Sequence, residues 1–552
     1  MDKSNTADKL IMDGPVSTVR RYHEQTKHRF ERYASGPEAL DWDAQPNPFR
    51  YFEGCALVEL PFSAETVTTN YPSLYKPSTV HSSEISLQSI AAFFELSFGL
   101  SAWKVYGKDR WALRCNPSSG NLHPTEAYVI FSASSVIQPG VYHYNSFEHA
   151  LEQRCAFRNS QPASQTLVNG HFLLGLSSVH WREAWKYGER AFRYCQLDVG
   201  HAVAAAEFAA ATLGWRVKVL SSWSDARIGS LLGLDRIDDF ANAEREEPDV
   251  LLYISPEEYP KDKDIGESAL FEMAQTGEWK GHANVLDRHH LYEWSIIDDV
   301  ARATQNISGT ELTWVPPLLP EPLELTNTQS ASALIKQRRS AQTFDGVSIL
   351  SKSTFFRMLD VTIPRRNLPP LSCWPVEPHL HFIVFVHRVE GLSPGLYAFV
   401  RNPSSEAKLR TSLRETFEWT RIEDCPGHMQ LFKLVGANAQ KAAARLSCQQ
   451  AIASDGAFSL AMLAEFDTVV QNNAWKYKQL YWEAGMLGQV LYLEAEAAGF
   501  RGTGIGCYFD DPVHELLGIT DTAFQDVYHF TVGMPLIDHR LVTLSPYHHL
   551  TR

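Results

Sequence analysis

The sequence predicts an α+β fold that is built from two similar halves. Part of residues 480–519 aligns without a gap with residues 198–234, which indicates an internal duplication. Each copy begins with a helix that is apolar on nearly every face and continues through a short extended segment to a Leu-Leu-Gly turn. The identical pairs are Gly200/Gly485, Ala210/Ala495, Gly214/Gly499, Arg216/Arg501, Asp225/Asp510 and the turns at 231–233 and 516–518.

The two duplicated helices are expected at the centre of the molecule. A helix without a polar face belongs inside a packed core, and the few charged side chains noted in these helices are Glu207, Glu494 and Glu496. Gly214 and Gly499 mark the helix ends, because glycine readily takes the left-handed cap conformation. Two homologous halves pack most simply with these helices against each other across a pseudo-twofold axis. We therefore expect a pseudo-dimer within one chain, which can act as a monomer.

The other elements of the two halves correspond as well. In chain order, we expect a helix and a proline-broken arm over 16–62, a helix over 85–104, strands at 128–131 and 139–144, and matching strands at 381–386 and 394–399. The proline-rich stretch 314–322 can be neither helix nor inner strand, so it predicts a linker. We place the first half at residues 1–315 and the second at 323–552.

The composition is that of an ordinary globular protein. A chain of 552 residues is too long for one core, and 44% hydrophobic with 21% charged residues is typical of soluble domains. The net charge of −14 argues against a nucleic-acid partner and favours a small-molecule substrate. No apolar run has the length of a signal peptide or a membrane helix, so we expect a cytoplasmic protein without membrane contact.

The eight cysteines are scattered and form no CxxC pair. This pattern predicts buried, reduced thiols in place of a zinc site or a disulfide framework. The histidine pairs at 289–290 and 548–549 have no partner at metal-binding spacing, so we expect no metal site.

The first of three chemically informative stretches is 336–344, which contains Arg338, Arg339 and Ser340. Two arginines and a hydroxyl can hold a phosphate through charge-assisted hydrogen bonds. The alternative is a solvated helix end whose cations complement the helix dipole.

The second stretch is 116–124, where small hydroxyl residues and a glycine stand between prolines. Such a loop lets backbone groups approach a flat ligand, although an ordinary turn has a similar composition. No GxSxG motif frames Ser118 or Ser119, so these serines do not indicate a hydrolase.

The third stretch is Gly-Thr-Gly-Ile-Gly at 502–506. A dinucleotide fingerprint must follow a strand and open a helix, whereas this one follows a helix and enters an extended segment. The glycines are therefore expected to bring the main chain against a planar ring.

In this order, and together with the duplication, these stretches resemble the nitroreductase-like FMN oxidoreductases. Within that family the sequence is most similar to the SagB-type dehydrogenases, a group that includes the azoline oxidases of peptide biosynthesis. PSSGNLHPTEAY, PGVYHY and EAGMLGQVLYLEAEAAGFRGTGIGCYFDD carry the resemblance. It implies two tandem nitroreductase-like domains, each an antiparallel sheet covered by helices, and an oxidoreductase that transfers a hydride through flavin N5, with NAD(P)H as a candidate donor.

The resemblance also implies that FMN binds where two subunits meet, with the arginine motif from one subunit and the Pro-Ser loop from the other. Here the first half has the loop but lacks the motif, since Arg20-Arg21 is followed by Tyr22. The second half has the motif but carries Pro-Pro-Leu-Ser-Cys-Trp at 369–374 in place of the loop. We therefore predict one composite FMN site per chain and a degenerate site at the mirror-related position.

The resemblance implies that the arginine stretch would hold the phosphate and the ribityl chain, and that the other half would supply the Pro-Ser loop. Gln479 and the glycine stretch at 504–506 would face the isoalloxazine. Gln342 stands where the family has another arginine, and Arg540 is expected to replace it. The predicted cofactor residues are Arg338, Arg339, Ser340, Gln342, Arg540, Pro117, Ser118, Ser119, Asn121, Gln479, Gly504, Ile505 and Gly506.

Lys476-Tyr477 resembles the Lys-Tyr pair that azoline oxidases use as acid and base. A desolvated lysine beside a tyrosine can move protons near neutrality if its pKa is lowered. Lys186-Tyr187 is the duplicate pair, and we choose Lys476 because it lies three residues from Gln479. The alternative for Lys476 is a surface lysine whose stem covers core aromatic rings.

Two other functions stay open. A flavin-free binding or interaction protein could retain the duplicated fold, which the missing second arginine favours. A peptide azoline oxidase would need a partner cyclase, whereas an NAD(P)H-dependent nitroreductase would not.

Overall fold

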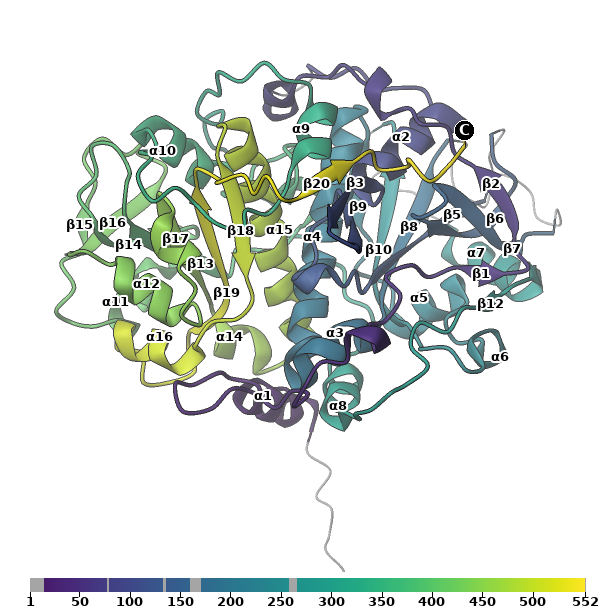
Figure 1. Ribbon diagram of the computed structural model, residues 1–552, viewed down its shortest axis with the longest axis horizontal. Helices are drawn as coiled ribbons and strands as arrows, with labels where there is room; N and C mark the ends of the chain where they lie inside the picture. The colour runs from purple at the N-terminus through teal and green to yellow at the C-terminus, as the bar shows by residue number, and fades with distance from the viewer. Residues whose placement is uncertain (1–13, 77–78, 133–135, 159–169, 258–265, 552) are drawn as a thin grey trace, which may run out of the picture.

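The computed structural model describes residues 14–76, 79–132, 136–158, 170–257 and 266–551, which form two α+β halves side by side (Figure 1). Each half contains a twisted sheet in which neighbouring strands run antiparallel. In the first half the order is β11-β7-β6-β5-β8-β10-β9, and β2 also pairs with β7. These strands are β2 (Ala56–Glu59), β5 (Thr125–Phe131), β6 (Gly140–Asn145), β7 (Ala150–Ala156), β8 (Phe172–Ser178), β9 (Arg216–Val219), β10 (Glu247–Ser255) and β11 (Glu278–Trp279).

The sheet of the second half follows the same path through space. Its order is β15-β16-β14-β13-β17-β19-β18, so β13 and β14 occupy the places of β5 and β6. The predicted strands at 128–131 and 381–386 therefore lie at equivalent positions, in β5 and β13. The strands are β13 (Leu380–Val386), β14 (Gly395–Val400), β15 (Thr420–Arg421), β16 (Gln430–Gly436), β17 (Phe458–Ala464), β18 (Arg501–Ile505) and β19 (Gln525–Gly533).

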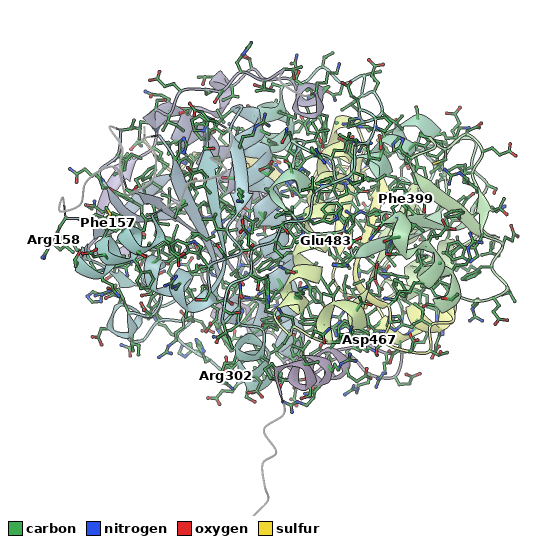
Figure 2. All side chains as sticks on the ribbon, turned by 180° about the vertical axis from the view of Figure 1, so that it is seen from behind. Phe157, Arg158, Arg302, Phe399, Asp467 and Glu483 are labelled. Atoms are coloured by element: carbon green, nitrogen blue, oxygen red, sulfur yellow. A yellow bond between two sulfur atoms is a disulfide. The ribbon has the colours of Figure 1, made fainter. Side chains whose placement is uncertain are left out.

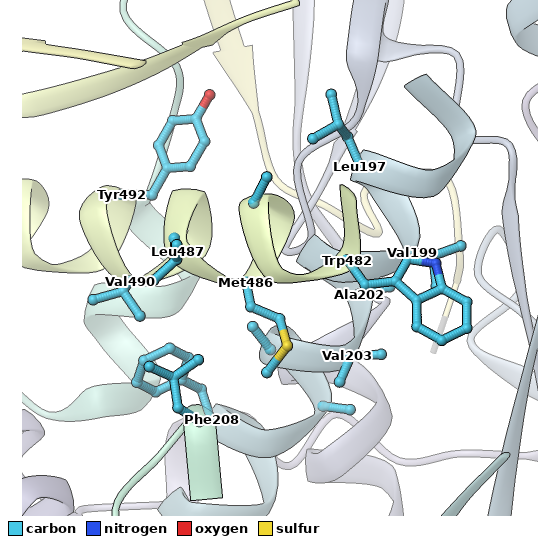
Figure 3. Close-up of a cluster of buried hydrophobic side chains, with 14 of the residues drawn as sticks. Leu197, Val199, Ala202, Val203, Phe208, Trp482, Met486, Leu487, Val490 and Tyr492 are labelled. Carbon is cyan, nitrogen blue, oxygen red and sulfur yellow. The ribbon is translucent and has the colours of Figure 1, made fainter. Parts of the chain in front are cut away.

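The duplicated helices, α4 (Ala191–Thr212) and α15 (Lys476–Ala497), lie between the two sheets and pack against each other (Figure 3). They cross at the matched pair Gly200 and Gly485. A Cβ atom on Gly200 would collide with the carbonyl oxygen of Trp482, and one on Gly485 would collide with that of Leu197. Because only glycine allows this close approach, the identity of this pair has a packing reason.

The ends of the chain cross between the halves. Helix α1 (Pro15–Gln25) lies across the junction of the two halves (Figure 1). It packs against α8 (Ser295–Ala303) of the first half, and its Arg20 pairs with Asp467 of the second half at 2.6 Å. At the other end, β20 (Val542–Leu544) pairs with β3 (Leu100–Tyr106), which also pairs with β4 (Asp109–Arg114). The end of the second half thus completes the β3–β4 sheet of the first half, while α1 bridges the junction.

The remaining helices cover the sheets and the ends of the central pair. In the first half they are α2 (Leu87–Ser97), α3 (His180–Tyr187), α5 (Asp225–Leu232), α6 (Ile237–Phe240), α7 (Glu267–Thr276) and α8 (Ser295–Ala303). In the second they are α9 (Ala331–Gln337), α10 (Lys352–Asp360), α11 (Glu406–Ser412), α12 (Gln440–Leu446), α13 (Ile452–Asp455), α14 (Phe466–Val470) and α16 (Asp510–Leu517). The short strands β1 (Phe52–Glu53) and β12 (His282–Ala283) form a separate pair.

Two expectations need correction. The helix predicted over 85–104 ends at Ser97, because residues from Leu100 onward join a sheet whose third strand, β20, comes from the far end of the chain. The eight cysteines are not all free thiols, since Cys448 and Cys507 form a disulfide. Their separation of 59 residues explains why no local motif indicated the pair.

Within the described part of the chain, no helix has both the length and the apolar character to span a bilayer.

Candidate functional site

A cavity of about 470 Å³ lies between the two halves. This volume is within the range of small-molecule and cofactor sites. The first half contributes the β3–β4 hairpin, the loop at 114–123, the end of α3 and the first half of α4. The second half contributes residues 338–342, β18 and the chain after β19. Of the predicted cofactor residues, the cavity wall includes Arg338, Arg339, Ser340, Gln342, Pro117, Ser118, Ser119, Asn121, Gly504, Ile505 and Gly506.

One end of the cavity is strongly cationic. The guanidinium of Arg338 is 4% exposed, donates from Nη2 to the carbonyl oxygen of Arg114 at 3.0 Å and lies 5.0 Å from the ring centroid of Tyr492. Arg339 donates to backbone carbonyls, including that of Ser101 at 2.9 Å. Neither guanidinium pairs with a carboxylate among the described residues.

Burial disfavours the charged form of both arginines. Burial lowers the pKa of Arg338, and burial together with the charge of Arg338 lowers the pKa of Arg339 to about 10. Lys104 and Arg501 line the same end of the cavity, and Arg501 lies 3.7 Å from Glu496. Glu496 is an acid that acts on Arg338, Arg339 and Arg501, so positive charge is in excess here and this end of the cavity is suited to a phosphate.

The loop from the first half is held by a buried acid on α4. Asp198 accepts hydrogen bonds from the backbone N–H and the hydroxyl of Ser119, both at 3.0 Å. The hydroxyl oxygen of Ser118 accepts from the backbone N–H of His123 at 2.8 Å. Burial raises the pKa of Asp198 to about 7, although the serine hydrogen bonds oppose this shift. A carboxyl group that titrates near neutrality therefore faces the cavity.

A second buried acid lies behind the first. Glu183 on α3 is fully buried, and neither of its carboxyl oxygens has a hydrogen-bond partner among the described residues. Burial, and then the nearby Asp198, raise the pKa of Glu183 well above its usual range. The same helix ends with Lys186 and Tyr187, and Tyr187 lines the cavity. On the first-half side, Tyr187 and Asp198 thus line the cavity, with Glu183 buried close to Asp198.

The opposite wall is formed by β18 and its continuation. A Cβ atom on Gly504 would collide with the hydroxyl of Tyr528, and one on Gly506 would collide with the ring of Tyr194. The hydroxyl of Tyr194 donates to the carbonyl oxygen of Gly506 at 3.1 Å. Glycine is required because tyrosine rings from both halves occupy the space that side chains would fill, which leaves main chain facing the cavity.

Several buried polar atoms around the cavity have no partner among the described residues. They are Arg114 Nε, Asn116 Oδ1, His123 Nδ1, His201 Nδ1 and Arg338 Nε. Burial lowers the pKa of His201 to about 3, so its ring is neutral and can offer Nδ1 as donor or acceptor. Because buried polar groups are normally satisfied, these atoms favour a polar ligand in the cavity.

Four of the predicted residues do not line this cavity. Arg540 is on the surface, where its exposed side chain pairs with Asp538 at 2.8 Å. Gln479 is buried elsewhere in the interface. The hydroxyl of Tyr477 bonds to His23 at 3.2 Å and to Tyr481 at 3.1 Å, and Lys476 lies beside it at the start of α15.

The direction of the central helices explains this placement. Tyr492 of α15 lines the cavity, and Lys476 is sixteen residues earlier on the same helix, roughly 24 Å away along its axis. The cavity wall contains residues from the beginning of α4 and from the end of α15. The Lys-Tyr pair that lies next to the cavity is therefore the one that precedes α4. The structure thus brings Lys186-Tyr187 to the cavity and leaves Lys476-Tyr477 at the mirror-related position.

That mirror-related position is almost completely filled. Its residual cavity of about 20 Å³ is lined by Val219, Leu220 and Ser221, which match Gly504, Ile505 and Gly506. The space is occupied by tryptophans, and the rings of Trp374 and Trp482 lie 5.8 Å apart. At the position that matches Asp198, Glu483 forms a buried ion pair with Arg401 inside the second half (Figure 2).

Sequence reasoning missed several residues of the wall. Arg501, which lies at the cationic end, is identical in both copies but was noted only as part of the repeat. Asp198 could have been found as a carboxylate inside an otherwise apolar helix. Lys104 and Trp111 gave no signal, because they reach the cavity only through the β3–β4 hairpin.

Comparisons with known proteins agree with this fold. Residues 97–242 match the model described as the Nitroreductase family. A putative nitroreductase from Anabaena variabilis superposes with a TM-score of 0.66 at 21% identity, covering 94% of this chain and 99% of its own. A chain of the Escherichia coli microcin synthetase McbBCD complex, bound to truncated pro-MccB17, gives a TM-score of 0.26 at 18% identity, covering 44% and 92%. No curated protein matches this chain.

The match to the Nitroreductase family model therefore lies in the first half of the chain. The Anabaena structure matches nearly the whole length of both chains, so the likeness extends over the two halves together. The predicted fold class, α+β with two nitroreductase-like halves joined as a pseudo-dimer, is confirmed.

Proposed function

We propose that this protein is an FMN-dependent oxidoreductase that binds one FMN per chain in the cavity between its halves. The observation that carries the proposal is the arginine pair at this end of the cavity: Arg338 is buried, Arg339 is partly exposed, and neither forms an ion pair with an acid among the described residues. Their position at one end of a cavity that also contains the Pro-Ser loop and the glycine strand supports a phosphorylated, flat ligand.

The residues present fit FMN. Arg338 and Arg339, assisted by Lys104 and Arg501, would hold the phosphate, with Ser340 and Gln342 beside the ribityl chain. Pro117, Ser118, Ser119 and Asn121 would approach the ring from the first half, and Gly504, Ile505 and Gly506 from the second. Because tryptophans fill the mirror-related position, the proposal requires a single FMN per chain.

Bound FMN would supply hydride transfer through its N5 atom, between a donor such as NADH or NADPH and a small-molecule acceptor. The chain's own contribution to proton transfer is at Asp198 and Tyr187. The pKa of Asp198, raised by burial to about 7, suits a group that gives or takes a proton near neutrality. Ser119 orients this carboxyl through two hydrogen bonds. Trp111 and residues of the segment at 535–541 also line the cavity.

The decisive experiment is to denature the purified protein and measure released FMN by its fluorescence. We expect close to one FMN per chain, whereas a flavin-free binding protein releases none even after incubation with FMN. Addition of NADPH under anaerobic conditions should then bleach the flavin absorbance if NADPH is the donor.

A second candidate, a partner-dependent peptide azoline oxidase, is favoured by one specific observation. Lys186 and Tyr187 lie beside the Pro-Ser loop, and a Cβ atom on Gly120 would come within 2.6 Å of the Tyr187 hydroxyl and 3.2 Å of Lys186 Nζ. In this case the peptide would be the electron donor and a cyclase would be the partner. Bleaching by an azoline peptide, together with no bleaching by NADPH or NADH, would support the second candidate.

We also propose that residues 1–315 and 323–552 are the two halves. They should not fold separately, because α4 and α15 bury each other and β20 completes the β3–β4 sheet of the first half. Expression of either half alone, followed by circular dichroism, tests this division.

A further inference from the structure

The Cys448–Cys507 disulfide borders the cavity. Cys507 follows β18 directly and lines the cavity together with Gln450. The Cα atoms of the two cysteines are 5.8 Å apart, as in ordinary disulfides. The other six cysteines are free, and five of them are buried. A single disulfide among free thiols is unlike the framework of a disulfide-stabilised scaffold.

The chain holds this pair firmly at the edge of the cavity. The side-chain amide of Gln450 donates to the carbonyl oxygen of Cys507 at 3.2 Å. Cys448 and Gln449 have φ values of 51° and 60°, in the left-handed region that non-glycine residues rarely adopt. Backbone strain of this kind is concentrated at functional sites. Neither cysteine is fully buried, and Cys507 lines the cavity.

The two halves differ at this point. In the first half, Ser222 stands at the position that matches Cys507. Ser222 follows Val219, Leu220 and Ser221, which line the filled mirror-related position. Cys507 therefore lies beside the open cavity, whereas the equivalent position of the first half carries a serine. The fold of a half thus does not require a cysteine at this position.

We propose that Cys448–Cys507 is a redox-active disulfide that accepts two electrons from reduced FMN bound in the same cavity. This inference rests on the proposed function. In the reaction the S–S bond breaks, and two electrons with two protons convert the two sulfurs into thiols, while the reduced flavin returns to its oxidised form. The protein thus stores four reducing electrons per chain, two on the flavin and two on the cysteines.

The test is an anaerobic reductive titration of the full-length, flavin-loaded protein with dithionite. Full bleaching of the flavin should need two equivalents of dithionite per flavin in the wild type and one in the double variant Cys448→Ser/Cys507→Ser. The control Cys55→Ser, which removes a partly exposed free thiol away from the cavity, should still need two. Alkylation and peptide mass spectrometry should find Cys448 and Cys507 blocked before the titration and labelled after it. The flavin-free protein, treated in the same way, should keep its disulfide.

Three results would overturn the inference. In the first, one equivalent bleaches the wild type and both cysteines stay blocked, which defines a structural cross-link. In the second, both cysteines are alkylated before any reduction. In the third, dithionite reduces the disulfide equally well without flavin. A chain that binds no FMN overturns the proposed function together with this inference, whereas each of the first two results with flavin bound overturns the inference alone.

Discussion

Replacement of Arg338 by methionine tests the cationic end of the cavity most directly. Methionine keeps much of the side-chain volume but removes the charge and the hydrogen-bond donors. A hydrogen bond that involves a charged group contributes about 1.5–3 kcal/mol, so Arg338→Met should raise the Kd for FMN by roughly 10- to 100-fold. The measurement is a fluorescence-quenching titration of flavin-free protein with FMN.

The flavin-free protein should respond in a different way. Arg338 is buried without an acidic partner among the described residues, and its burial lowers the pKa of the guanidinium. Removing this unbalanced charge should leave the Tm of the flavin-free protein unchanged or higher, while the increase in Tm that FMN produces becomes smaller. A purely structural arginine would show the reverse pattern, with a lower Tm and an unchanged response to FMN.

Arg20→Met is the matched control. Arg20 belongs to the Arg-Arg pair of the first half, but it forms a partly exposed ion pair with Asp467 far from the cavity. Such pairs contribute about 0–1 kcal/mol, and FMN affinity should not change. Equal losses of FMN affinity in Arg338→Met and Arg20→Met would refute the composite site.

Three further predictions concern the rest of the site. Burial raises the pKa of Asp198 from 3.8 to about 7, so the folded state holds this proton more tightly than the unfolded state and loses stability as the pH rises from about 4 to 7. Asp198→Asn should remove this loss, which is about 4 kcal/mol over the whole range and about 3 kcal/mol between pH 5 and pH 8, where urea unfolding measures it; an unchanged difference in unfolding free energy between the two pH values would show that Asp198 is not the titrating group. Tyr187→Phe should lower turnover per bound flavin by roughly 10- to 100-fold with unchanged flavin content, whereas Tyr477→Phe should lower stability by about 1–3 kcal/mol and leave turnover unchanged. Steady-state kinetics normalised to bound FMN decides between the two tyrosines, and the opposite assignment would restore Tyr477 as the catalytic candidate. Trp374→Ala should cost about 3–5 kcal/mol in thermal or urea unfolding and leave the content at one FMN per chain; a second bound FMN would show that the mirror-related position can still form a site.

The duplication and the central position of its helices could be predicted because both are local patterns. The Gly200/Gly485 identity and the apolar faces of the helices are visible in the sequence, and the structure places both helices at the centre. The strands at 128–131 and 381–386 were found for the same reason, since each is a continuous apolar run.

The three chemical stretches were also visible in the sequence, but their relative positions were not. The resemblance suggested that Arg338 and Ser118 belong to one site, and the tertiary structure brings them to the same cavity from opposite halves. The disulfide was missed because Cys448 and Cys507 meet only after β18 and the turn before Gln450 are in place.

The sequence alone determined that the chain has two related halves, which motifs each half has kept, and which helices form the centre, because repeats and periodicity depend only on neighbours along the chain. Only the tertiary structure decided which Lys-Tyr pair reaches the cavity and that tryptophans fill the mirror-related position. The physical reason is that the pseudo-twofold packing places the beginning of α4 and the end of α15 at the same cavity. No local sequence pattern specifies which end of a helix lies beside which part of the other half.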